Sequence, residues 1–380
     1  MKINRHLQRV GWLLLLSGLV IGGLFWHHSN VEAGTKPAKL SPSAKIKARV
    51  AKMSTNEKIG QLFVTGVSNN SAAVRHDIKE YHLGGIILMG NNFVGSRKQF
   101  KHRLSNYQRS AKIPLTISTD QEGGTVSRLS SNPRISGHRY YFSPQQADKK
   151  GGMKEVKKIY RLEAKTLRSL GINWDFAPVA DVSKNHHSFI YNRTFKPSYQ
   201  KTASYIRQVV PVIQHQHVAA TLKHFPGYGS AADTHTGSAT VNRSLSSFEK
   251  RDFVPFKAGI NSGVDAVMVT HIILRKIDPK KPASLSYKDI SLLRKQLDFK
   301  GVIVSDSLQM QAVGNYATRH HVQRDVAAFK AGNDVILSSD YKKGIRHLRY
   351  AIAHKHLSQK RLNQSVERIL TLKQKLGLKI

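Results

Sequence analysis

Gly301-Val302-Ile303-Val304-Ser305-Asp306-Ser307 is a short apolar stretch, rich in β-branched residues, that ends in a carboxylate. Similar runs recur along the chain from Ile59 onward, and longer stretches with helical spacing separate them. The eight runs are Ile59–Val67, Gly84–Met89, Leu115–Asp120, Trp174–Asp181, Ala219–Phe225, Ala266–His271, Val302–Asp306 and Val335–Ser339. Alternating βα units in that number predict a parallel (β/α)8 barrel of the TIM type.

The intervening stretches predict helices around this barrel. Lys154–Leu170 has apolar residues at helical spacing, and Gln200–His215 has the same pattern, which Pro211 interrupts. Ser358–Leu376 is expected to close against the barrel wall. The chain has 380 residues, 40% of them apolar, which is enough for one large core. We therefore predict an α/β fold with a single catalytic barrel at residues 48–380.

The N-terminal region has the composition of an export segment. Basic residues precede an uncharged, apolar stretch at residues 10–26, which is long for a cleaved signal and just long enough to cross a bilayer. We expect residues 1–33 to be a signal peptide or a membrane anchor, and residues 34–47 to be a linker. Either reading predicts an exported protein, extracellular or associated with the cell wall. An uncleaved segment would anchor it in the cytoplasmic membrane.

The chain is strongly basic, with 61 Lys and Arg against 23 Asp and Glu and a net charge of +38. This charge favours a polyanionic neighbour, such as an anionic cell wall, a membrane surface or nucleic acid. The basic residues are scattered and follow no nucleic-acid-binding motif, so we expect a basic enzyme without a nucleic-acid partner, acting as a monomer. The absence of cysteine excludes disulfides and thiolate chemistry.

Polar residues lie at the ends of six of the eight runs. In barrels of this type the active site lies at the carboxyl ends of the strands, so these residues are candidates for chemistry. Any one of them could instead cap the helix that follows. They are Asp120, Asp181, the Lys223-His224 pair, His271, Asp306 and Asp340.

The stretch Lys223-His224-Phe225-Pro226-Gly227-Tyr228-Gly229 is followed by Asp233-Thr234-His235. A Lys and a His at the mouth of a strand can bind sugar hydroxyls, and the Gly and Pro residues favour an irregular loop over the site. In an Asp-x-His pair the carboxylate can fix the imidazole tautomer and leave the other nitrogen free to exchange a proton. Taken alone, the pattern is weak and fits a solvated loop histidine better.

Asp306 is the carboxylate that the opening stretch delivers to the top of the barrel. A retaining glycosidase needs one carboxylate to attack the anomeric carbon and a second group to protonate the leaving oxygen. Asp306 suits the first role. The second group is usually another carboxylic acid, so His235 in that role would depart from the general scheme.

Four ordered motifs together resemble the β-N-acetylhexosaminidase branch of glycoside hydrolase family 3. They are Asp120-Gln121-Glu122-Gly123-Gly124, Lys223-His224-Phe225-Pro226-Gly227, Asp233-x-His235 and Val304-Ser305-Asp306. The resemblance runs from about Ser54 to the C-terminus. It implies a single barrel with Asp306 as nucleophile and Asp233 with His235 as the acid/base pair. Members of this branch lack the acid/base carboxylate that relatives bring from a second domain.

The resemblance also implies that Asp120 binds sugar hydroxyls in the −1 subsite, with Arg128, Lys223 and His224 as further contacts. The segment 192–195 resembles a family stretch near the site, although a structural ion pair explains Arg193 equally well.

Four other positions near these motifs carry less certain roles. Glu122 is expected to hold its loop, and Asp181 to serve either structure or substrate. Thr125 and Tyr228 depart from the family, where many relatives carry Arg and His. Neither is expected to perform chemistry, but both could alter what the open side of the pocket accepts.

The sequence predicts neither a metal site nor a cofactor. Histidines are adjacent or nearly so at 186–187, 215–217 and 320–321, but no further ligands at suitable spacing accompany them. Nucleotide-binding motifs such as GxGxxG and the P-loop are missing.

The implied activity is retaining, exo-acting hydrolysis of terminal non-reducing β-N-acetylglucosamine, naturally on peptidoglycan fragments. A β-glucosidase or β-xylosidase of the same family is the alternative within enzymes, with the 233–235 loop arguing against it. A phosphorolytic variant stays open as well. The alternative from another class is a non-catalytic protein with the same barrel that binds the cell wall through its positive charge. Such a protein would not need Asp306, His235 and Asp233, so their presence argues against it.

Overall fold

The structure is a computed structural model that describes residues 41–229 and 231–380. Its centre is a parallel sheet of eight strands in the order β11-β9-β7-β6-β3-β2-β1-β12, which is the chain order of a closed barrel. A parallel bridge between Val304 and Val335 joins the two edges. The strands are β1 (Phe63–Gly66), β2 (Gly85–Leu88), β3 (Thr116–Thr119), β6 (Trp174–Asp175), β7 (Ala219–Phe225), β9 (Ala266–Val269), β11 (Val302–Ser305) and β12 (Ile336–Leu337). The predicted TIM-type barrel is confirmed.

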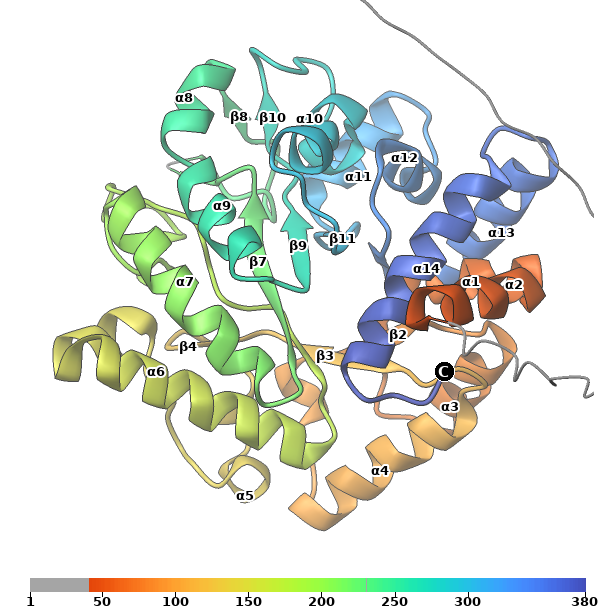
Figure 1. Ribbon diagram of the computed structural model, residues 1–380, viewed down its shortest axis with the longest axis horizontal. Coiled ribbons are helices and arrows are strands. Elements are labelled where there is room, and N and C mark those ends of the chain that lie inside the picture. Colours follow the sequence, from red (N-terminus) through yellow and green to blue (C-terminus); the bar gives the residue numbers. More distant parts are fainter. Residues whose placement is uncertain (1–40, 230) are drawn as a thin grey trace, which may run out of the picture. The chain divides into compact units, whose positions relative to one another are not determined.

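Helices surround this sheet on the outside (Figure 1). They are α1 (Pro42–Lys52), α2 (Thr55–Gln61), α3 (Ser71–Glu80), α4 (Arg97–Ser110), α5 (Pro133–Ser136), α6 (Pro144–Leu170), α7 (Tyr199–Gln214), α8 (Leu245–Lys250), α9 (Phe253–Asn261), α10 (Tyr287–Ser291), α11 (Gln311–Arg319), α12 (Arg324–Ala331), α13 (Tyr341–Ala353) and α14 (Gln359–Lys375). Two short strand pairs lie outside the barrel: β4 (Gln121–Gly123) with β5 (Val126–Ser127), and β8 (Thr240–Val241) with β10 (Ile273–Leu274).

The strands form because their residues are β-branched or apolar and are buried on both faces. All four residues of β2, β9 and β11 are buried, as expected for a parallel sheet covered by helices. The predicted start of the first run was wrong, because Ile59 lies in helix α2. Ser54 begins that helix through a capping box in which Glu57 binds back to the Ser54 N–H at 2.7 Å.

Two of the predicted helices are longer or more continuous than expected. The stretch Lys154–Leu170 forms the second part of α6, which begins at Pro144 and changes direction at Gly151 and Gly152. Pro211 does not interrupt α7, which continues to Gln214. The closing helix α14 begins after its N-cap Ser358, as predicted.

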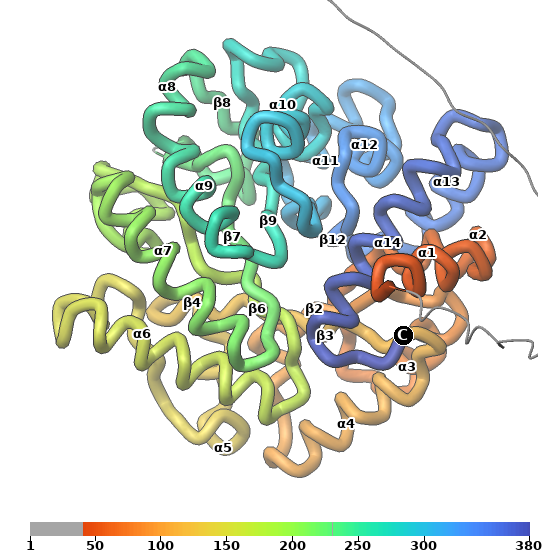
Figure 2. Tube along the Cα trace, in the orientation of Figure 1, coloured from red at the N-terminus to blue at the C-terminus, as the bar shows by residue number. Residues whose placement is uncertain are grey.

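Part of the predicted linker, residues 34–47, belongs to the folded unit, and this prediction was wrong from Pro42 onward. Helix α1 begins there, with Ser41 as its N-cap, and it buries Ile46 and Val50. It packs against α14 near the end of the chain (Figure 2), so burial of its apolar face stabilises it.

The predicted export segment, residues 1–33, lies outside the described residues. Within residues 41–229 and 231–380, no helix combines the length and apolar character needed to span a bilayer.

Candidate active site

A pocket of about 370 Å³ lies at the carboxyl ends of the barrel strands. It brings together six of the seven predicted site residues, and the seventh, Asp233, adjoins it through His235. Its wall is formed by Gly66, Ile87, Met89, Asp120, Glu122, Val126, Arg128, Arg193, Lys223, His224, His235, Met268, Asp306, Ser307, Gln309, Leu337, Ser338 and Ser339. The location is the one in which barrels of this type place their chemistry.

Asp306 follows β11 directly and lines the pocket. Its Oδ1 accepts a hydrogen bond from the Ser307 N–H at 2.7 Å. Burial would raise the pKa of this carboxyl, but the imidazoles of His224 and His271, the Ser307 N–H and Lys223 together hold the pKa below its ordinary value. Asp306 is therefore a carboxylate over the physiological pH range, which the predicted role of nucleophile requires.

Lys223, on β7, is buried between two carboxylates. Its Nζ lies 2.8 Å from Asp120 Oδ1 and 2.6 Å from Glu122 Oε1. Burial opposes the charge of this amine, but the two carboxylates raise its pKa above the ordinary value. The amine therefore stays protonated, and Lys223 fixes the position of Asp120 at the pocket wall.

Arg193 forms a bidentate ion pair with Glu122, with both nitrogen–oxygen distances at 2.8 Å. This ion pair fits the structural explanation of Arg193, and it fits the expectation that Glu122 holds its loop. Burial raises the pKa of Glu122, but Arg193 and Lys223 outweigh it and hold the pKa far below its usual range. Arg193 also reaches the pocket, where its Nη2 lies 3.3 Å from His224 Nε2.

His224 is held by Asp181, which is fully buried behind it. The Asp181 Oδ2 atom lies 2.6 Å from His224 Nδ1 and accepts the His224 backbone N–H at 3.0 Å. This contact places the proton on Nδ1 and turns Nε2 toward the pocket. Asp181 is not among the residues that line the pocket, so the geometry favours its structural role.

Arg128 contributes a guanidinium group to the pocket. Its Nη2 lies 3.5 Å from Asp120 Oδ2, and its buried Nε has no hydrogen-bond partner. A buried donor without a partner is costly unless a ligand or water satisfies it. The Arg128 Nε–H can therefore donate a hydrogen bond to a ligand beside Asp120.

The loop that carries Asp120 and Glu122 is supported by Glu163, a residue that the sequence did not single out. The Gln121 side chain donates to Glu163 Oε1 at 2.8 Å and accepts the Leu129 N–H at 3.0 Å. The Gln121 N–H donates to Asp175 Oδ1 at 2.9 Å. Glu163 comes from α6, far away in the sequence, so no local pattern could have revealed this support.

Asp233 and His235 occupy the loop after β7. The His235 Nδ1 atom lies 2.6 Å from Asp233 Oδ1, which also accepts the His235 N–H at 2.9 Å. The carboxylate therefore engages Nδ1 and leaves Nε2 free. The His235 side chain is 60% exposed and lines the pocket.

Several residues at strand ends do not reach the pocket. His271 is buried, with Nδ1 2.7 Å from Ser284 Oγ and Nε2 2.9 Å from the Ser307 carbonyl oxygen, so it supports the turn after Asp306. Asp340 forms an ion pair with Arg324. Thr125 is exposed and lies outside the pocket wall. Among the described residues, no three His, Cys, Asp or Glu side chains are grouped so that they could hold a metal ion.

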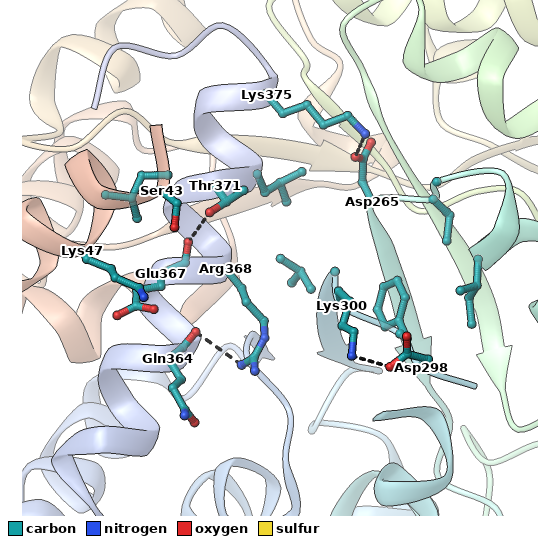
Figure 3. A pocket seen from close by; sticks show the side chains of 18 residues that line it. Ser43, Lys47, Asp265, Asp298, Lys300, Gln364, Glu367, Arg368, Thr371 and Lys375 are labelled. Carbon is teal, nitrogen blue, oxygen red and sulfur yellow. Dashed lines mark hydrogen bonds and ion pairs between the residues drawn. The ribbon is translucent and has the colours of Figure 1, made fainter. Parts of the chain in front are cut away.

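A larger hollow, of about 640 Å³, lies at the opposite end of the barrel (Figure 3). It adjoins the residues that precede β9 and β11, and four of its charged side chains form two ion pairs. Lys375 Nζ lies 2.5 Å from Asp265 Oδ1, and Lys300 pairs with Asp298. The predicted site residues are all elsewhere, so this hollow is not the candidate active site.

The profile described as glycosyl hydrolase family 3 N terminal domain matches residues 54–372. The chain belongs to glycosyl hydrolase family 3. A β-hexosaminidase of Xanthomonas oryzae pv. oryzae is 34% identical to it over 273 residues, which are 70% of this chain and 79% of that protein. A β-hexosaminidase of Stenotrophomonas maltophilia is 36% identical over 266 residues, or 67% of this chain and 76% of that protein.

Solved structures of family 3 proteins are also similar. The β-N-acetylglucosaminidase from Paenibacillus sp. str. FPU-7 superimposes with a TM-score of 0.79 at 32% identity, covering 86% of this chain and 63% of that one. A family 3 member from Mycobacterium smegmatis does so with a TM-score of 0.76 at 28% identity, covering 85% and 98%. The predicted family and the predicted enzyme class, a glycoside hydrolase with β-hexosaminidase relatives, are confirmed.

Proposed function

We propose that this family 3 protein is a retaining, exo-acting β-N-acetylglucosaminidase that uses Asp306 as nucleophile and His235 as general acid and base. The observation that carries the proposal is the composition of one pocket. An ionised carboxylate on a rigid strand end and an imidazole with one free nitrogen line the same cavity, together with groups suited to sugar hydroxyls. The β-hexosaminidase names of the relatives support the substrate class.

In the first step, the Asp306 carboxylate attacks the anomeric carbon while the glycosidic C–O bond breaks. The leaving oxygen takes the proton from Nε2 of the His235 imidazolium and departs as an alcohol. Asp233 stabilises the imidazolium before the transfer and keeps Nδ1 engaged throughout. The result is a covalent glycosyl-enzyme on Asp306.

In the second step, a water molecule attacks the same carbon. Neutral His235 takes the water proton on Nε2 as the bond to Asp306 breaks, which restores both side chains. Two displacements give a product with the β configuration of the substrate.

The charges of the pocket wall favour a neutral sugar. Three carboxylates line it, from Asp120, Glu122 and Asp306, and three cationic side chains, from Arg128, Arg193 and Lys223. The opposite charges neutralise one another in pairs along the floor. Asp120, Arg128, Lys223 and His224 are proposed to hold the hydroxyls of the sugar in the −1 subsite.

The natural substrate is proposed to be terminal β-N-acetylglucosamine on peptidoglycan fragments. An exported protein with a net charge of +38 would meet such fragments at an anionic cell wall or membrane surface, where its charge favours retention. The extracellular or wall-associated location is part of the same proposal.

Release of 4-nitrophenol from the β-N-acetylglucosaminide and from the β-glucoside tests the activity. Wild type is expected to turn over the N-acetylated substrate, with activity lost in Asp306→Ala and sharply reduced in His235→Ala. Assays with and without inorganic phosphate separate hydrolysis from phosphorolysis. Folded wild type that is inactive on both glycosides would instead support the non-catalytic wall-binding reading.

A further inference from the structure

Tyr228 is one of the two positions at which the sequence differs from the family that it resembles, and it contacts His224 and Asp181 beside the pocket. Its side chain is buried, with 2% of its surface exposed. The Tyr228 ring packs edge-on against His224, with centroids 5.6 Å apart, and against Phe189 at 4.9 Å. Its backbone N–H donates to Asp181 Oδ1 at 2.7 Å. The ring therefore has a fixed place beside the residues that hold His224.

The Tyr228 hydroxyl, at the far end of this ring, binds the loop that carries the proposed acid/base pair. The Thr234 N–H donates to Tyr228 Oη at 3.0 Å, and the hydroxyls of Tyr228 and Thr234 are hydrogen-bonded to each other. Thr234 is the residue between Asp233 and His235. Thr234 is fully buried, whereas the Asp233 and His235 side chains are 30% and 60% exposed.

Thr234 ties the described part of this loop to the rest of the fold. Among residues 231–236, Thr234 is the one that is buried. Its carbonyl accepts the Ala312 N–H at 3.2 Å. A hollow of about 560 Å³ adjoins the loop, and its wall includes Tyr228, Gly229 and Ala231. The position of His235 consequently depends on how Thr234 is held.

We propose that the Tyr228 hydroxyl is a latch that positions His235, by binding the backbone and the side chain of Thr234. Tyr228 is a positioning residue and takes no part in proton transfer to the substrate. The inference rests on the proposed acid/base role of His235. Burial raises the pKa of Tyr228 to about 12, so the phenol keeps its proton and both hydrogen bonds over the working pH range.

The latch matters most for the step in which His235 protonates the leaving group. A general acid must lie within hydrogen-bonding distance of the oxygen that it protonates, and small displacements are costly. A displaced His235 should therefore slow the cleavage of glycosides with basic leaving groups far more than that of glycosides with acidic ones. Binding in the −1 subsite should not change, because the Tyr228 ring and the Asp181 contact are independent of the hydroxyl.

The test compares Tyr228→Phe with wild type on phenyl and 4-nitrophenyl β-N-acetylglucosaminide. We expect kcat/KM to fall by about tenfold to about 100-fold for the phenyl glycoside, and by less than about threefold for the 4-nitrophenyl glycoside. The inhibition constant of free N-acetylglucosamine should be unchanged. Thr234→Val should reproduce the leaving-group effect, and Thr234→Ser, which keeps the hydroxyl, should retain nearly wild-type rates.

His235→Ala in the same assays separates the two proposals. A loss in His235→Ala that Tyr228→Phe does not share overturns the latch and leaves the proposed function intact. A uniform loss in Tyr228→Phe on both glycosides, with weaker inhibition by N-acetylglucosamine, also overturns the latch, because it would indicate general damage to the subsite. Wild-type kcat/KM on both glycosides in His235→Ala would instead remove the proposed function.

Discussion

Lys223 Nζ lies 2.8 Å from Asp120 Oδ1, which joins strand β7 to the end of strand β3 at the floor of the pocket. The same nitrogen lies 2.6 Å from Glu122 Oε1. A single buried cation therefore neutralises two carboxylates that would otherwise repel each other. This relationship makes the subsite and the stability of the barrel depend on the same side chain.

Replacing Lys223 by Met should lower both the stability of the barrel and the activity that depends on the proposed −1 subsite. The variant keeps most of the volume but leaves Asp120 and the buried Glu122 without their shared cation, and loss of one partner from a buried pair typically costs about 3–5 kcal/mol. Urea unfolding measures the stability, and 4-nitrophenyl β-N-acetylglucosaminide turnover measures the subsite. Lys257→Met, at an exposed position on α9, is the matched control and should be neutral. Equal stability of the two variants would show that the buried pair contributes nothing.

The carboxyl of Asp306 should produce no acid limb in the pH dependence of kcat/KM above a pH of about 4. His224, His271, the Ser307 N–H and Lys223 hold the pKa of Asp306 below its ordinary value, so the proposed nucleophile stays ionised. Rates with 4-nitrophenyl β-N-acetylglucosaminide from about pH 4 upward check this. An acid limb in that range that disappears in no variant other than those of Asp306 would contradict it.

Glu163 should weaken the fold as the pH rises. Its carboxyl is buried, its Oε2 has no partner, and burial raises its pKa well above 4.5. An acid with a raised folded-state pKa binds its proton more tightly in the folded state, so stability falls with increasing pH above the unfolded value. Glu163→Gln, which keeps the bond to Gln121, should therefore be increasingly more stable than wild type between about pH 5 and about pH 8. A difference that does not grow with pH would mean that Glu163 is ionised in the fold.

Lys373 should show the opposite pH dependence. This buried amine donates to Gln61 Oε1 at 2.6 Å, and burial lowers its pKa from 10.5 to about 7. The cost of burying the charge is complete below the folded-state pKa and disappears as the pH rises toward the unfolded value. Lys373→Met should therefore stabilise the protein most below about pH 7, and progressively less toward pH 10. Unfolding free energies at several pH values check this, with Lys360→Met, at an exposed position on the same helix, as the control.

The eight strands could be predicted because each is a short apolar run whose end coincides with a change in composition. Element boundaries were predicted wrongly where two local sequence signals favoured different structures. Ile59 is apolar and adjoins a strand, yet the Ser54–Glu57 capping box places it in a helix. The segment from Pro42 has the composition of a linker, but burial of Ile46 and Val50 against the rest of the fold makes it helical.

The pocket residues could be predicted because they follow strands or belong to compact motifs. The residues that hold the pocket residues in place could not be predicted. Glu163 reaches Gln121 on β4 from helix α6, and Asp181 contacts both His224 and Tyr228. Such contacts depend on the closed barrel and leave no periodic trace in the sequence. The sequence shows that Tyr228 differs from the residue that many relatives carry there, but only the structure connects its hydroxyl to Thr234.

The most direct test of the proposed mechanism is the mass of His235→Ala after reaction with 2,4-dinitrophenyl β-N-acetylglucosaminide. This substrate needs little acid assistance, so the first step should proceed while the second, deprived of its base, is slow. We predict that one N-acetylglucosaminyl group accumulates on the protein and that peptide mapping places it on Asp306. An adduct on another residue, or turnover without an adduct and with inversion at the anomeric carbon, would contradict the mechanism.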